Sequence, residues 1–187
     1  MAGSLSPSAH QGSGPMQIEL RKNLALQPGT FSAVIAPEKM MIDALNGNAD
    51  LQRFLFLYIS GNYSRILSGL NRSSKNFEVR RSFTAHQLLS TLREAGHTVI
   101  FIEHDPTLFE NAMDTIELIA GALKEAGRES LVVLYTPAAD RTFSLLARKA
   151  DRYIEVVPVP LDMKPMRTVR AMRQIGRRPA GQLALEV

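Results

Sequence analysis

Residues 98–106 read TVIFIEHDP and decide the fold class. The run from Thr98 to Ile102 is continuous and apolar, which is typical of a strand buried on both faces of a sheet. The following Asp105-Pro106-Thr107 predicts a helix start, because Asp is a preferred N-cap residue and Pro suits the first helical turn. A buried strand that passes directly into a helix indicates an α/β protein with parallel strands.

Outward from this stretch, apolar runs alternate with helical patterns along the chain. The other predicted strands are residues 31–36, 55–59, 77–81, 131–135 and 153–157. The predicted helices are residues 40–45, 63–70, 84–96, 105–127 and 139–149. Such alternation implies right-handed crossovers between parallel strands. We therefore predict a three-layer α/β sandwich with a mainly parallel sheet, whose central strands are residues 31–36, 98–102 and 131–135.

Side-chain patterns within these segments predict the core and the helix ends. Thr84 and Gln87 form a capping-box pattern, and Gly96 stands where a left-handed C-terminal residue would end that helix. The apolar positions predict a shared hydrophobic core. Its expected members are Val34, Leu57, Ile100, Ile102, Ile116, Val133 and Leu146.

Composition limits the classes of protein that need to be considered. The 187 residues are 45% hydrophobic and 21% charged, enough for one compact domain. The chain has no Cys, so it has no disulfide framework, thiolate metal site or cysteine nucleophile, and we expect a cytoplasmic protein that is compatible with the nucleoid. Its apolar runs are shorter than the roughly 18 residues of a membrane span, so no membrane partner is expected. A homo-oligomer is compatible with the sequence.

Three regions are expected from composition shifts. Residues 1–15 are rich in Ser, Gly and Pro and are predicted to be disordered, as a native tail or as a leader added for expression before Met16. Residues 16–160 are predicted to form the α/β core. Residues 161–187 form a basic C-terminal extension.

Ligands of open parallel sheets bind beyond the carboxyl ends of the strands, so the residues there are candidates. Glu103 and Asp105 could act as a catalytic base or hold a Mg²⁺-bound water, although Asp105 also fits a helix cap. His104 could titrate or bind a metal, but a lone His is more often structural, and we predict no metal site. Lys39 and Thr136 are candidate contacts for a nucleotide, with a solvated lysine and an ordinary turn as the alternatives.

The order of these pieces resembles the RecA-like recombinase and KaiC-like ATPase superfamily. The resemblance covers about residues 24–157 and rests on residues 28–29, 57–62, 83–89, 99–105 and 150–156. It implies a RecA-like core in which the strand ending at Ile102 is the Walker B strand and the turn after Ala36 is the phosphate loop. That turn reads PEKMM and lacks the glycines and Lys-Ser/Thr pair of a phosphate loop, which implies a degenerate member without a Walker A motif.

The C-terminal extension carries a basic stripe with no acidic residue between Asp162 and Glu186. If this segment is helical, a spacing of three residues gathers its arginines on one side, where they could contact phosphates or an acidic partner. The alternative is a solvated basic face. The residues concerned are Lys164, Arg167, Arg170, Arg173, Arg177 and Arg178. Residues 182–187 alternate like a strand and predict a C-terminal β-hairpin.

Together these features predict a non-catalytic RecA-like protein that serves DNA recombination or repair by binding DNA or a recombinase-like partner. Because a triphosphate needs backbone amides and a lysine around it, ATP and Mg²⁺ are not expected as cofactors. One alternative is an ATPase or regulator with an atypical phosphate site around Lys39, Glu103 and Asp105. Another is a signalling or scaffolding subunit.

Overall fold

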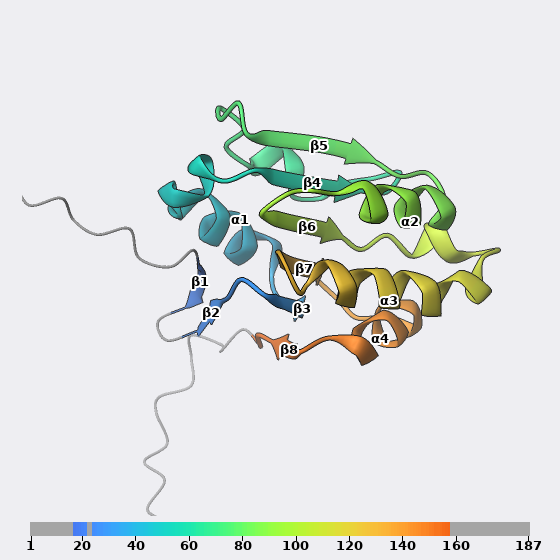
Figure 1. The fold of residues 1–187 in the computed structure, drawn as a ribbon. Helices are drawn as coiled ribbons and strands as arrows, with labels where there is room; N and C mark the ends of the chain where they lie inside the picture. Colours follow the sequence, from blue (N-terminus) through green and yellow to red (C-terminus); the bar gives the residue numbers. More distant parts are fainter. Residues whose placement is uncertain (1–16, 22–23, 158–187) are drawn as a thin grey trace, which may run out of the picture. The chain divides into compact units, whose positions relative to one another are not determined.

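The computed structural model describes residues 17–21 and 24–157. Its centre is a six-stranded sheet in the order β5-β4-β6-β7-β3-β8, and all neighbouring strands run parallel (Figure 1). In chain order the strands are β3 (Thr30–Ile35), β4 (Phe56–Ser60), β5 (Phe77–Arg81), β6 (Val99–Glu103), β7 (Leu131–Thr136) and β8 (Arg152–Glu155). The predicted parallel sheet is confirmed, with β6 and β7 in its middle and β3 as an interior strand beside β8.

Helices cover both faces of the sheet, which confirms the three-layer sandwich (Figure 1). The helices α2 (Ala85–Glu94), α3 (Ile116–Ala126) and α4 (Arg141–Leu146) pack on one face. Helix α1 (Glu38–Gly47) and the short helices η1 (Ala49–Arg53) and η2 (Leu67–Gly69) pack on the other. Because both faces are covered, the interior strands β3, β4, β6 and β7 are almost wholly apolar and buried, whereas the edge strands β5 and β8 carry charged residues. All seven predicted core residues are buried.

The α1 face also carries an antiparallel hairpin that the sequence did not predict. It consists of β1 (Ile18–Arg21) and β2 (Leu24–Leu26), and it forms a separate two-stranded sheet. Ile18 and Leu26 are fully buried against the same cluster as α1. Gly29 then adopts a φ of 71° in the turn into β3, a conformation that favours glycine.

The prediction of one long helix at residues 105–127 is wrong for the first half of that segment. The chain there forms two short 3-10 turns, η3 (Pro106–Phe109) and η4 (Met113–Thr115), and α3 begins only at Ile116. Ala112 has a φ of −142° and a ψ of 38°, outside the helical region, which interrupts the helix. Thr115 donates its hydroxyl to Ala112 O, and such local bonds from Thr compete with helix propagation.

Other helix boundaries also differ from the predictions. In residues 63–70 only η2 is helical, because the Ser64 hydroxyl caps Leu67 N and tethers the segment to the sheet. In residues 139–149 helix α4 begins after the cap Asp140 and ends in the 3-10 turn η5 (Ala147–Lys149). The prediction of a left-handed conformation at Gly96 is wrong, because among the described residues the glycine with a positive φ is Gly29. The C-cap of α2 is Ala95, which has an extended conformation.

Predictions at the two ends of the chain fall outside the described residues. They concern disorder at residues 1–15, the basic stripe and the C-terminal hairpin. Across residues 17–21 and 24–157, no helix combines the length and the apolar character that crossing a membrane requires.

Candidate functional site

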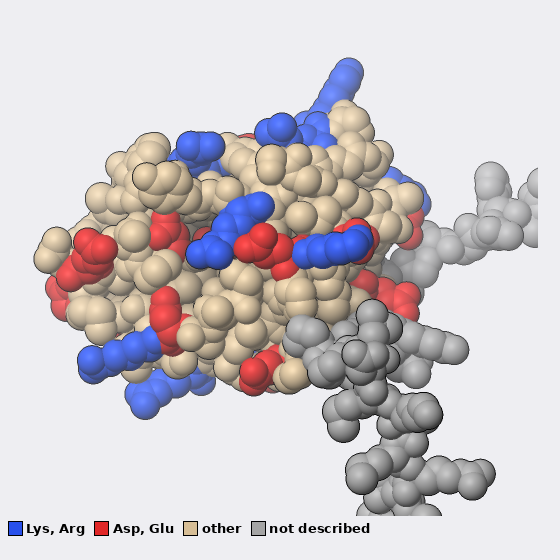
Figure 2. All heavy atoms as spheres, turned by 180° about the vertical axis from the view of Figure 1, so that it is seen from behind, with Lys and Arg blue, Asp and Glu red and all other residues tan. Residues whose placement is uncertain are grey.

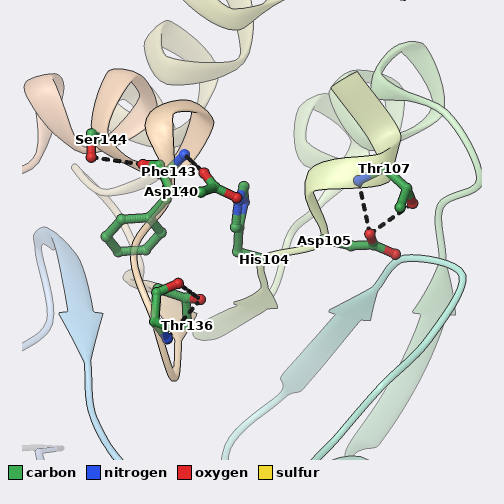
Figure 3. A network of polar contacts seen from close by, with 8 residues as sticks. His104, Asp105, Thr107, Thr136, Asp140, Phe143 and Ser144 are labelled. Carbon is green, nitrogen blue, oxygen red and sulfur yellow. Dashed lines mark hydrogen bonds and ion pairs between the residues drawn. The ribbon is translucent and has the colours of Figure 1, made fainter. Parts of the chain in front are cut away.

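The carboxyl edge of the sheet brings the loop after β4 against the end of β6. Asp105 Oδ1 accepts from Thr107 N at 3.0 Å and from Thr107 Oγ1 at 2.7 Å (Figure 3). Asp105 Oδ2 accepts from Asn62 N at 2.9 Å. Asn62 Nδ2 also donates to Thr107 Oγ1 at 3.0 Å. Asp105 therefore caps η3, as one of its two predicted roles required, and it also holds the loop that follows β4.

Close packing at this point requires a glycine at position 61. A Cβ on Gly61 would lie 2.2 Å from Asp105 Oδ2, far inside van der Waals contact. The absence of a side chain lets the backbone approach the carboxylate closely enough for Asn62 N to donate. The Ser60-Gly61-Asn62 turn is thus fitted to Asp105.

Glu103 is only 4% exposed and is surrounded by hydrogen-bond donors. Its carboxylate accepts from the Tyr58 hydroxyl, from Ser64 Oγ at 2.5 Å and from Arg65 N at 2.7 Å. Burial, followed by the adjacent Glu103 charge, raises the pKa of Tyr58, so this phenol remains a donor. A buried carboxylate needs such partners, and these anchor the loop after β4 to the sheet. Sequence analysis missed all three.

The position predicted for a phosphate loop carries a negative charge instead of a phosphate-binding group. Helix α1 starts after Pro37 without a side-chain cap, and Glu38 lies in its first turn. Arg65 reaches across from the loop after β4, and its Nη1 lies 3.5 Å from Glu38 Oε1. A phosphate at this helix start would therefore meet the Glu38 carboxylate, which offsets the favourable field of the helix N-terminus.

Lys39 and Thr136, the two candidate nucleotide contacts, have local partners. Lys39 is 86% exposed in its side chain and pairs with Asp43 one helical turn further on, at 2.8 Å. Thr136 is buried, and its hydroxyl donates to Ala138 O at 2.7 Å within the turn after β7 (Figure 3). The geometry of both residues matches the structural alternatives, a solvated lysine and an ordinary turn.

The buried His104 side chain makes a hydrogen bond to a partly exposed residue from another element. The His104 side chain is 2% exposed, and its Nε2 lies 2.9 Å from Asp140 Oδ2, the N-cap of α4 (Figure 3). Phe109 and Phe143 pack against the imidazole ring. Within the described part of the chain, no group of three or more His, Cys, Asp or Glu residues is arranged to hold a metal ion. The contact of His104 with Asp140 and its packing against two phenylalanines match its structural alternative.

Burial alone would raise the pKa of Asp140, but hydrogen bonds from Phe143 N and His104 outweigh it and lower that pKa below its usual value. Asp140 thus stays ionised while it caps α4 and contacts His104. The partnership had a sequence signal, because His104 follows a strand and Asp140 precedes a helix at the same predicted edge. Strand order was needed to recognise that β6 and β7 are neighbours.

At this edge, Glu103, His104 and Asp105 have partners in β4, in the loops after β4 and β7, and in η3. Lys39 pairs within its own helix. The network ties β4, β6, β7 and α1 together at the edge where parallel sheets bind ligands. Its polar groups hold one another in place: the carboxylates of Glu103 and Asp105 each accept several hydrogen bonds from the protein itself.

Comparison with known proteins finds relatives of two kinds. The chain is 45% identical over 129 residues to an uncharacterized protein of Archaeoglobus fulgidus, a match that covers 68% of this chain and 65% of the relative. It is 26% identical over 91 residues to the macrolide export ATP-binding/permease protein MacB of Campylobacter jejuni, which covers 46% of this chain and 14% of that protein. No family model matches the chain. The sequence is therefore similar over most of its length to one archaeal protein and over a short stretch to an ATP-binding/permease protein.

Proposed function

We propose that this chain is a non-catalytic protein with a RecA-like core that assists DNA recombination or repair by binding DNA or a recombinase-type partner. The observation that carries the non-catalytic part is Glu38 at the start of α1, where a phosphate loop would supply glycines and a lysine. Glu103, at the position of a Walker B carboxylate, is occupied by three protein donors. Both features support a fold that no longer hydrolyses a nucleotide.

The distribution of charge supports the binding part of the proposal. Residues 158–187 contain six Lys or Arg and two Asp or Glu, whereas residues 1–157 contain sixteen of each. The formal net charge of +4 is thus carried entirely by the C-terminal segment. On the face of the core in Figure 2, acidic and basic side chains are interleaved. A concentrated positive segment on a neutral core favours a polyanionic partner.

Titration of labelled single- and double-stranded DNA at several salt concentrations tests this proposal. Phosphate contacts release counterions, so log K should fall with log salt at a slope of roughly 0.9 per phosphate neutralised on duplex DNA. Replacing both Arg170 and Arg173 by Ala should reduce the magnitude of that slope by about two, to a similar extent for every DNA sequence. The matched control removes two exposed cations of the core, Arg72 and Lys75, and should leave the slope unchanged.

The proposal fails if the parent protein does not bind DNA at low salt and binds no recombinase-type protein. Binding to such a protein without DNA affinity would retain the accessory role and move the contact to an acidic protein surface. A protein that binds neither would be better described as a scaffolding or signalling subunit. The lack of Cys fits the reducing cytoplasm, where we propose that the protein acts.

A nucleotide-dependent regulator is the second candidate, and the similarity to an ATP-binding/permease protein favours it. The site would then use Lys39 as its cation and the β6 edge as its acidic side. Isothermal titration with ATP and Mg²⁺ distinguishes the two proposals. A saturable heat that is lost in Lys39→Ala and retained in Lys75→Ala would favour the regulator, whereas the non-catalytic proposal expects no such heat.

A further inference from the structure

Among the described residues, strand β5 forms one edge of the six-stranded sheet and pairs with β4 alone (Figure 1). Phe56 N donates to Asn76 O, and Ser82 N donates to Ser60 O, so the even-numbered residues of this segment direct their backbone groups toward β4. Successive residues of a strand direct these groups to opposite sides. The N–H and C=O groups of Val79 and Arg81 therefore point away from β4, and no strand within residues 17–21 and 24–157 pairs with them. Such an edge is a template for another strand.

Two side chains of opposite charge lie on either side of Val79 in β5. Glu78 and Arg80 flank Val79, which is 37% exposed. They pair in register with Leu57 and Ile59 of β4, so their side chains lie on the face that α2 covers. Arg80 Nε donates to Glu78 Oε1, and Arg80 also lies 3.8 Å from Glu94 at the end of α2. His97 Nε2 lies 2.9 Å from Glu78 Oε2. Hydrogen bonds from Arg80 and His97 lower the pKa of Glu78, so the carboxylate stays charged.

Only certain registers allow a second β5 to hydrogen-bond to this edge in antiparallel orientation. The outward-facing residues Phe77, Val79 and Arg81 must lie opposite one another. If Val79 lies opposite Phe77, Glu78 faces the other Glu78, and if Val79 lies opposite Arg81, Arg80 faces the other Arg80. Both registers place like charges directly across the strands, which is unfavourable. When Val79 faces Val79, each Glu78 lies opposite an Arg80.

We propose that two copies of this chain associate through their β5 edges in this antiparallel, two-fold symmetric register. Each Val79 N–H then donates to the Val79 carbonyl of the other copy, and each Arg81 N–H donates to the opposite Phe77 carbonyl. Phe77 N is already used within its own chain, where it donates to Ser74 O. The two sheets become continuous across the symmetry axis. The opposite charges of Glu78 and Arg80 specify this pairing, since the same edge segment is complementary to itself.

Charge reversal gives the sharpest test. Sedimentation of the full chain should show a species of twice the 20.7 kDa monomer mass. Glu78→Arg and Arg80→Glu each place like charges opposite one another in both pairs, so each variant alone should dissociate with a constant raised about tenfold or more. Mixing the two variants restores opposite charges across the axis. The mixture should therefore form a heterodimer that neither variant forms with itself.

Backbone variants test the same pairing without changing the charge. Val79 N–H points away from β4, so Val79→Pro leaves the β4 ladder intact and removes the central donor of the pairing. It should raise the dissociation constant by about tenfold, while Val79→Thr should retain the dimer. This comparison also decides the matter if a charge variant fails to fold.

The inference is overturned if the parent chain sediments as a monomer at its highest soluble concentration. It is also overturned if the mixed charge variants do not associate, or if Val79→Pro dimerises as well as Val79→Thr. DNA binding is not needed for any of these measurements, so their outcome is separate from that of the proposed function.

Discussion

At the scale of single residues, the packing of Gly61 against Asp105 makes a specific prediction. Gly61→Ala would place a methyl group 2.2 Å from Asp105 Oδ2 and should lower the free energy of unfolding by about 1–3 kcal/mol. Gly96→Ala is the matched control, because its Cβ meets nothing within 4 Å and its φ is not left-handed. Urea denaturation should show the control to be neutral or slightly stabilised. Equal stability of the two variants would contradict the close packing.

Glu103 offers a second test at the residue scale, because a role as a structural anchor predicts a loss of stability on substitution, whereas a catalytic role predicts a loss of activity. If Glu103 anchors Tyr58, Ser64 and Arg65, Glu103→Gln should lower the free energy of unfolding by about 1–3 kcal/mol, because Gln cannot accept all three hydrogen bonds. The exposed Glu110→Gln is the control and should be neutral. A Glu103→Gln protein with parental stability in thermal and urea denaturation would disprove the anchoring role.

At the scale of elements, Asp140 links the start of α4 to the end of β6, and its titration makes the stability of the folded protein depend on pH. Its pKa in the folded protein is lowered, so its contribution is present above the unfolded pKa and is lost as the pH falls through the folded one. Asp140→Asn keeps a capping side chain but has no charge to lose. The stability advantage of the parent over Asp140→Asn should therefore shrink between about pH 5 and pH 3. An advantage that is constant over this range in urea titrations would contradict the prediction.

At the scale of the whole molecule, the polar contacts at the carboxyl edge of the sheet predict that the protein does not hydrolyse ATP. A triphosphate would have to displace the Arg65–Glu38 contact and find amide donors in a turn without glycines. Phosphate release from ATP and Mg²⁺ should therefore equal the background without protein. Turnover that is abolished in Glu103→Gln and retained in Glu110→Gln would contradict this and favour the nucleotide-dependent candidate.

The sequence by itself was sufficient for the class of fold and for much of the core. The six predicted strands of a mainly parallel sheet all form, and the interior ones were recognisable because a strand buried on both faces is continuously apolar. The sequence also predicted the N-cap of α2, where Thr84 Oγ1 accepts from Gln87 N, although Gln87 Oε1 accepts from Phe83 N and not from Thr84 N as in a capping box. These features depend on neighbours within a few residues, so a local pattern encodes them.

Tertiary structure alone decided how the candidate residues are used. Glu103, His104 and Asp105 were identified as an edge cluster, but their partners Ser64, Asn62 and Asp140 lie about 35 to 45 residues away in the sequence. The hairpin at residues 18–26, which the sequence did not predict, buries Ile18 and Leu26 against the α1 face of the sheet. In the interrupted segment at residues 105–115, Leu108 and Phe109 are buried in the core on the other face, so burial of apolar surface acts there beside the local bond of Thr115. Sequence periodicity carries no information about which distant loop supplies a partner, because that depends on the order of the strands in the sheet.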